Sequence, residues 1–229
     1  MHARPSYNEL TMTDPLTTTV SVLALSVSAV TAWLTLFRRG TVKMTRPTVI
    51  FFGADKLRSP EDRPPPKVYL RALLFSTSRR GRVIESMYAS LSRNETHQNF
   101  NIWVYGEREK LVRGSGLYVG ETGVAVDHHF LTPGDENGFR FTEGRYRLDV
   151  YAHILGDKNR TLLFAETLEI SGEIAAILKE PDAGLYFDWG PDSSRYLTHI
   201  DRQPMPPIPD DILALLQEGR GQSRKEIKR

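Results

Sequence analysis

The sequence predicts an all-β protein, an antiparallel sandwich or barrel, that follows a single membrane-spanning helix. Three observations lead to this prediction. A run of 22 residues near the N-terminus contains no charged side chain. Short stretches rich in Val, Ile, Leu, Tyr, Phe and Thr follow, and Gly, Asn, Asp or Ser stands at each break between them. The gaps between these stretches are too short to hold the helices that a parallel α/β sheet requires.

The charge-free run, Leu16–Phe37, is long enough to cross a bilayer. As a helix it would extend about 33 Å, against a hydrocarbon core of about 30 Å. Eight of its residues are Ser or Thr, and in a membrane helix such hydroxyls can bond to the preceding turn. We therefore expect a transmembrane helix over residues 16–37, after an N-terminal segment over residues 1–15.

Two other interpretations of this run stay open. A cleaved signal peptide is the main alternative, because Val30-Thr31-Ala32 is similar to a small-residue cleavage site. Against it, the positive charges follow the run, whereas a secretory signal carries them in front. A buried helix of the globular body is the third interpretation, but the run lacks the polar stripe that a surface helix shows.

The flanking charges predict the orientation in the membrane. The formal charge is −1 before the run and +4 from Arg38 to Arg46. The positive-inside rule therefore places the N-terminus outside and the large C-terminal part in the cytoplasm. We expect a single-pass protein of the cell membrane, with the lipid bilayer as its first partner. The net charge of +2 gives no case for a nucleic-acid partner.

The chain after the run divides into three parts. Residues 38–66 form a basic collar and a Pro-rich spacer, with one short strand at Thr48–Gly53. Residues 67–170 form the sandwich domain, in which the expected strands are Val68–Thr77, Val83–Ser92, Gln98–Tyr105, Leu111–Val119, Gly123–Leu131, Phe139–Phe141 with Tyr146–Leu155, and Thr161–Ile170. Residues 171–229 form a cover over the sandwich, a Pro-rich stretch, a short helix behind Asp210 and Asp211, and a basic tail.

Alternation with a period of two predicts which face of each strand is buried. In the stretch from residue 145 to 155 the inward set is Tyr146, Leu148, Val150, Ala152 and Ile154. In the stretch from 98 to 105, Phe100, Ile102 and Val104 form the apolar set, which leaves Trp103 and Tyr105 on the other side. About 105 residues with such faces are enough to close one core.

The stretch Phe139–Ile154 resembles the late strand pair of immunoglobulin-like and fibronectin-type-III-like sandwiches. Tyr146 follows Gly144 by two residues, which is similar to the tyrosine corner of those domains. The resemblance implies an immunoglobulin-like fold, and a Tyr146 hydroxyl bonded to backbone a few residues upstream. It implies no function, because this fold hosts many unrelated ones. The whole chain also resembles bacterial membrane-anchored proteins.

Histidines and an aspartate provide the candidates for chemistry. In Asp127-His128-His129 adjacent side chains point to opposite faces of a strand. His128 therefore belongs with the apolar set, as a core histidine with one hydrogen bond. His129 and Asp127 share the other face, and a metal or hydrolase site there would need a third ligand, either His153 or Glu121. Because nothing in the spacing requires such a site, we expect no metal and no cofactor.

Four aromatic residues could line one exposed sheet face: Trp103, Tyr105, Tyr118 and Tyr151. Exposed aromatics on a sheet can stack on sugars or anchor a protein partner. The alternative is that the C-terminal 59 residues cover this face, because large apolar patches are rare on monomers.

The sequence thus predicts a non-enzymatic interaction module, for binding or scaffolding, held at the membrane with a protein partner there. A carbohydrate- or small-ligand-binding sandwich that uses the four aromatic residues is the first alternative. A metal-dependent hydrolase around His129, Asp127 and His153 is the second.

Overall fold

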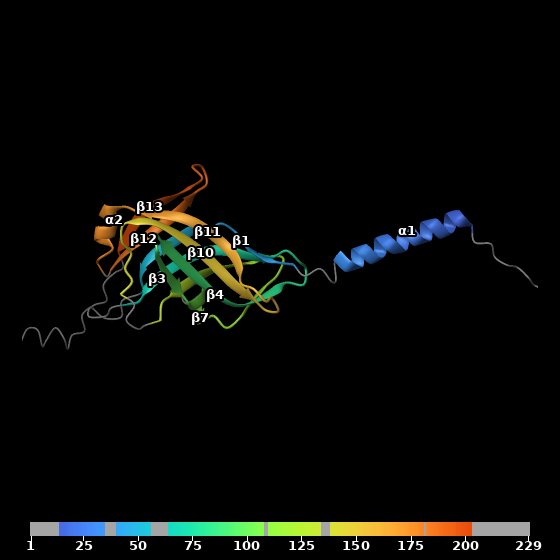
Figure 1. The fold of residues 1–229 in the computed structure, drawn as a ribbon, viewed down its shortest axis with the longest axis horizontal. Helices are drawn as coiled ribbons and strands as arrows, with labels where there is room; N and C mark the ends of the chain where they lie inside the picture. Colours follow the sequence, from blue (N-terminus) through green and yellow to red (C-terminus); the bar gives the residue numbers. More distant parts are fainter. Residues whose placement is uncertain are drawn as a thin grey trace, which may run out of the picture.

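The computed structural model describes residues 14–34, 40–55, 64–107, 110–133, 138–180 and 182–202. Helix α1 (Pro15–Ala32) precedes a body of antiparallel strands, and Figure 1 shows it lying apart from that body. An antiparallel β protein behind an apolar N-terminal helix is therefore confirmed. The predicted segment before residue 14, the Pro-rich stretch after residue 202, the short C-terminal helix and the basic tail lie outside the described residues.

Helix α1 is long and apolar enough to cross a membrane, with 18 residues and a mean hydropathy of 1.5. It begins behind Asp14, whose side chain accepts a hydrogen bond from the Leu16 amide at 3.1 Å. Its leucine and valine side chains are 58–72% exposed, and no residue of the helix is buried. Six hydroxyls donate to the carbonyl four residues earlier, as expected for a membrane helix: those of Thr18, Thr19, Ser21, Ser26, Ser28 and Thr31.

The larger sheet, sheet A, has antiparallel strands in a spatial order that differs from the chain order. That order is β13 (Arg195–Arg202), β12 (Ala183–Gly190), β2 (Val49–Ala54), β3 (Pro66–Ser76), β9 (Val124–Leu131), β6 (Ile102–Glu107) and β7 (Lys110–Arg113). Strand β1 (Val42–Met44) also pairs with β3, beyond the part that pairs with β2. The chain after α1 thus enters the body along one edge of β3.

The smaller sheet, sheet B, has the order β11 (Thr161–Ile170), β10 (Gly144–Ile154), β4 (Arg82–Arg93) and β5 (Thr96–Phe100), and β8 (Leu117–Val119) pairs with the start of β4. The short helix α2 (Gly172–Ile177) then leads the chain from β11 to β12 in sheet A. Ser171 caps it by accepting a hydrogen bond from the Ile174 amide.

The inward faces of the two sheets share one hydrophobic core. The alternation predicted for β10 is confirmed, because its five inward side chains are at most 2% exposed: Tyr146, Leu148, Val150, Ala152 and Ile154. Phe52, from β2, lies at the centre with no exposed surface. Its ring centroid is 5.2 Å from those of Phe141 and Phe187, so it joins β12 of sheet A to the segment that precedes β10 of sheet B.

The predicted strand Gln98–Tyr105 is wrong, because the chain changes sheets at Asn101. Strand β5 ends in sheet B at Phe100, and β6 begins in sheet A at Ile102. The change of sheet shifts the inward phase by one residue. Phe100 points into the core from sheet B, and Trp103, which is 3% exposed, points into it from sheet A. Ile102 and Val104, predicted to be inward, are half-buried.

The predicted sandwich boundaries, residues 67–170, are too narrow. Strands β1 and β2 come from the supposed collar and spacer, and pair with β3 in sheet A. Strands β12 and β13 come from the supposed cover, and they lengthen sheet A beyond β2. The sandwich extends past residue 170 because β12 alternates as a core strand does, with Leu185 and Phe187 buried in the core. The two-sheet body, named the sandwich below, thus runs from residue 42 to residue 202.

Candidate functional site

The Asp127-His128-His129 sequence is divided between two faces of β9. His128 has no exposed surface, and its Nδ1 accepts a hydrogen bond from Trp103 Nε1 at 3.2 Å. Its Nε2 is buried without a partner. Burial lowers the pKa of His128 to about 4. A core histidine with one hydrogen bond, the interpretation drawn from the sequence, is confirmed.

Asp127 lies on the outer face of sheet A and joins β9 to β3. Its Oδ1 accepts hydrogen bonds from Arg71 Nη1 at 2.7 Å and from the Tyr69 hydroxyl at 3.2 Å. The carboxylate raises the pKa of Arg71, and burial together with this carboxylate raises the pKa of Tyr69. The His129 ring lies 4.9 Å from the Tyr69 ring, between centroids. These side chains form a polar cluster that holds two strands in register.

His153 belongs to the other sheet. It lies exposed on β10 in sheet B, where its Nδ1 is 2.9 Å from Glu85 Oε2. The predicted set of His129, Asp127 and His153 is therefore not brought together. Within the described residues, no group of three His, Cys, Asp or Glu side chains is placed to hold a metal ion. The geometry gives no support to the metal-dependent hydrolase.

The four predicted aromatic residues do not form one face. Trp103 is buried in the core, and Tyr105 stacks on it with centroids 4.6 Å apart. Tyr118 is 59% exposed on β8 of sheet B. Tyr151 lies on β10, stacked on Tyr88 with centroids 5.1 Å apart. The aromatic platform fails because the change of sheet at residue 101 turns the first two rings inward.

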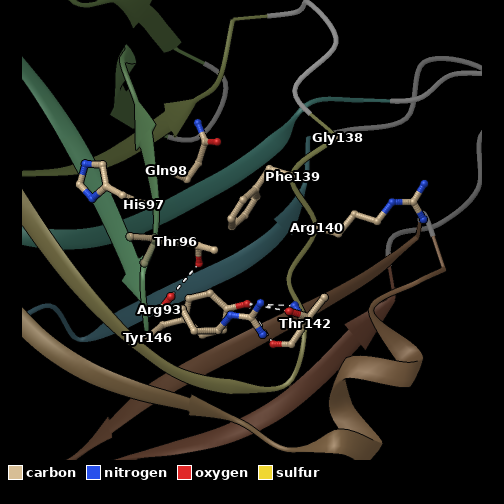
Figure 2. A pocket seen from close by; sticks show the side chains of 10 residues that line it. Arg93, Thr96, His97, Gln98, Gly138, Phe139, Arg140, Thr142 and Tyr146 are labelled. Atoms are coloured by element: carbon tan, nitrogen blue, oxygen red, sulfur yellow. Dashed lines mark hydrogen bonds between the residues drawn. The ribbon is translucent and has the colours of Figure 1, made fainter.

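A hollow of about 350 Å³ opens at one end of the sandwich, between the β4–β5 hairpin and the segment before β10 (Figure 2). Figure 2 shows Phe139 directed towards the hairpin and Arg140 directed away from it. The residues that line it, named the end hollow below, are Leu91, Arg93, Thr96, His97, Gln98, Gly138, Phe139, Arg140, Thr142 and Tyr146. Strand β4 runs from Arg82, beside Gly40, to Arg93 at this hollow. The end hollow therefore lies at the opposite end from the entry of the chain.

Tyr146 fixes the shape of the end hollow. Its hydroxyl donates to the Thr142 carbonyl oxygen at 3.0 Å and accepts from the Thr142 amide at 3.0 Å. This is the contact to upstream backbone that the sequence predicts. Arg93 lies over the Tyr146 ring, 5.6 Å from its centroid, and donates to the Glu143 carbonyl oxygen. No local pattern in the sequence marks Arg93 and Phe139 as neighbours, because only the fold brings residues 91–98 and 138–146 together.

No protein-family model and no curated protein matches the chain. The geometry of the described residues is therefore the basis for the function proposed below.

Proposed function

We propose that this protein is a single-pass, membrane-anchored interaction module without enzymatic activity. The observation that carries the proposal is the exposure of α1, whose leucines and valines are 58–72% exposed and whose residues are nowhere buried. Burying a leucine or valine side chain gains about 1.5–3 kcal/mol. Seven such side chains on one isolated helix therefore need an apolar environment that the sandwich does not supply, and a bilayer supplies it.

An immunoglobulin-like topology for the sandwich is part of this proposal. Strands β2, β3, β9 and β6 are neighbours in sheet A, and β11, β10, β4 and β5 are neighbours in sheet B. Taken as strands A, B, E and D and strands G, F, C and C′, they follow the immunoglobulin order. The Tyr146 contact at the start of β10 supports the same assignment. Strands β1, β7, β8, β12 and β13 are additions to that plan.

The charges around α1 favour a sandwich on the cytoplasmic side. Arg46, counted in the predicted collar, forms an ion pair with Glu166 and stacks over Trp189 at 4.2 Å. Arg38, Arg39 and Lys43 remain to carry the positive-inside signal, against a charge of −1 before the helix. In the alternative, cleavage after Ala32 would release the sandwich on the outer side.

Membrane fractionation with protease protection tests both the anchor and the side. We expect the full-length chain, tagged at its C-terminus, to remain in the membrane after washing with salt and with alkali. Protease added to intact cells leaves the tag uncut, and cuts it once the membrane is opened. Recovery of a soluble chain that lacks about its first 32 residues, as a signal peptide requires, would falsify the proposal.

The end hollow is the surface that we propose for the protein partner. It lies at the opposite end of β4 from the entry of the chain, and its rim carries Phe139, Arg93 and Arg140, residue types that are enriched at interfaces. A photo-crosslinking residue at Arg140 is expected to form a defined adduct in intact cells. The matched control is Ala165, exposed on β11 away from the hollow. An equal pattern of adducts from the two positions contradicts this assignment.

A further inference from the structure

The end of the sandwich opposite the end hollow is strongly basic. Two turns, the β3–β4 turn (residues 77–81) and the β10–β11 turn (residues 155–160), are named the basic end here. They expose four cations, Arg79, Arg80, Lys158 and Arg160, of which Arg160 lies over the Tyr151 ring, 5.0 Å from its centroid. Asp157, in the second turn, is neutralised by Arg82, with Nη2 and Oδ1 2.7 Å apart. In the neighbouring β8–β9 turn, Glu121 is an exposed carboxylate. The described residues of this end therefore carry a net positive charge.

The chain that follows α1 packs directly against the basic end. A Cβ added at Gly40 would lie 2.5 Å from the Cβ of Ser78, so only glycine fits at this close approach. The next residue, Thr41, accepts a hydrogen bond from the Thr77 amide at 2.9 Å. The entry of the chain is thus fixed against the β3–β4 turn.

Arg82 joins this entry to the second turn. Its Nη1 donates to the Gly40 carbonyl oxygen at 2.9 Å, and its Nη2 donates to the Leu155 carbonyl oxygen at 3.3 Å. The same guanidinium forms the ion pair with Asp157. Only 13% of the Arg82 side chain is exposed. Arg82 therefore links the entry of the chain directly to the β10–β11 turn.

Chain length keeps the basic end near the end of α1. Five residues, 35–39, separate Leu34 from Gly40. Even fully extended, this connection spans only about 20 Å. The headgroup layer is about 5–7 Å deep on each side of the hydrocarbon core, and the Debye length is about 8–10 Å at physiological salt. With the helix in the bilayer, this connection lets the cations approach within a Debye length of the lipid surface.

Two exposed apolar groups lie among these cations. Leu155, at the start of the β10–β11 turn, is 59% exposed. Tyr118 is also 59% exposed, and its hydroxyl donates to the Arg80 carbonyl oxygen at 3.2 Å. An aliphatic side chain and an aromatic ring beside Arg and Lys are the composition of surfaces that lie in a membrane interface.

We propose that the basic end binds the anionic headgroups of the membrane that holds α1, and so seats the sandwich on the lipid surface. The proposal rests on the membrane anchor of the proposed function. With the basic end on the lipid, the orientation of the sandwich is fixed. The end hollow, at the far end of β4, then points away from the membrane.

A position-specific fluorescent probe on the full chain tests this contact. Because the chain has no cysteine, Asn159→Cys in the β10–β11 turn gives a single labelling site for an environment-sensitive dye. The control is Glu95→Cys, exposed in the turn between β4 and β5 at the other end. Both labelled chains are inserted into vesicles of phosphatidylcholine alone, and into vesicles of phosphatidylcholine mixed with phosphatidylserine. We expect a blue shift at position 159 in the anionic vesicles only, and no shift at position 95.

Charge reversal in the first turn separates lipid binding from simple proximity. Each cation removed near an anionic surface weakens the attraction about fivefold. Arg79→Glu with Arg80→Glu is therefore expected to abolish the blue shift at position 159. Arg113→Glu with Lys179→Glu makes the same charge change at exposed positions elsewhere on the sandwich, and should preserve it. Raising the salt to 1 M shortens the Debye length to about 3 Å, and should also remove the shift.

The outcomes distinguish this proposal from the anchor on which it rests. Identical emission in the two kinds of vesicle, from a chain that resists alkaline extraction, overturns the lipid contact and leaves the anchor standing. Extraction of the chain by alkali overturns both. Loss of the blue shift in both double variants also contradicts the proposal, because the effect would then follow net charge and not the basic end.

Discussion

Helix α1 and the core of the sandwich are both apolar, yet they meet opposite surroundings. The leucines and valines of α1 are 58–72% exposed, whereas Phe52, Leu70 and Leu148 in the core have no exposed surface. The core side chains are buried by one another, and this burial stabilises the fold. Those of α1 contribute nothing to the sandwich, and in the proposed function it is the bilayer that buries them.

This difference separates two properties of the chain. We expect changes in the core to act on the free energy of unfolding, and changes in α1 to act on where the folded protein resides. The four predictions below test this separation, beginning with the largest expected effect.

Phe52→Ala should produce the largest loss of stability. Phe52 is fully buried between Phe141 and Phe187, and truncating such a ring costs about 3–5 kcal/mol. Denaturant titration of the full chain in lipid nanodiscs, followed by tryptophan fluorescence, measures it. Val112→Ala, at an exposed position on β7, is the control. Retention of the Phe52→Ala chain in the membrane should be unchanged, and its release would argue against two independent regions.

Leu23→Arg, near the middle of α1, should weaken retention in the membrane and leave the stability of the sandwich unchanged. A central arginine costs about 2.5–3.5 kcal/mol of insertion free energy, and the leucine contributes slightly in favour. We expect much of the chain to leave the membrane fraction, with the unfolding midpoint of the sandwich unaltered. Leu197→Arg makes the same substitution on β13, where Leu197 is 48% exposed, and should leave fractionation unchanged. If Leu23→Arg shifts the unfolding midpoint, α1 and the sandwich are coupled.

His128 should make the sandwich sensitive to acid. Its pKa is about 4 in the folded chain and 6.5 when unfolded. Between these values the unfolded chain binds more protons, so stability falls as the pH falls, by about 3 kcal/mol over the whole window. His128→Asn keeps an acceptor for Trp103 Nε1 without the titration. Its stability should change less than that of the native chain between pH 6.5 and pH 4. If the stabilities of the two chains change equally with pH, His128 is not the cause of the acid sensitivity.

Tyr146→Phe should cause the smallest loss, about 1 kcal/mol, because one hydroxyl is removed from a side chain that otherwise stays buried. The loss should be local. Hydrogen exchange of the Thr142 amide, which donates to this hydroxyl, should accelerate more than exchange in β4. Tyr105→Phe, whose hydroxyl bonds the Gly116 carbonyl oxygen, serves as a matched control. If exchange in the Tyr146→Phe chain accelerates equally at the Thr142 amide and at the amides of β4, then Tyr146 supports the whole fold and not only the rim of the hollow.

Local alternation predicted the parts of the fold where a strand lies regularly between two partners. Strand β10 pairs with β11 and β4 along nearly all of its length, so its inward residues follow a period of two. The faces of β9 follow the same rule, which is why His128 was correctly assigned to the core. Alternation failed at Asn101, because a change of sheet reverses the inward phase without any local signal such as Gly or Pro.

The candidate site was less predictable, because it depends on which turns meet in space. The segments SRRG and GDKNR are visible as turns in the sequence. Nothing local shows that Arg79 and Lys158 share one end of the sandwich, or that Arg82 joins their turns to Gly40. The end hollow depends likewise on two segments about 45 residues apart. Such juxtapositions follow from strand order, which a single sequence does not encode locally.

The hydroxyl groups of α1 have a consequence for lateral association within the bilayer. A hydroxyl has one proton to donate, and six of these donors are already bonded to the carbonyl four residues earlier. Helices in lipid are often held together by hydrogen bonds from just such side chains. In α1 those donors are directed inward along its own backbone. For the anchor proposed above, these six donors are therefore not available to bond a neighbouring helix.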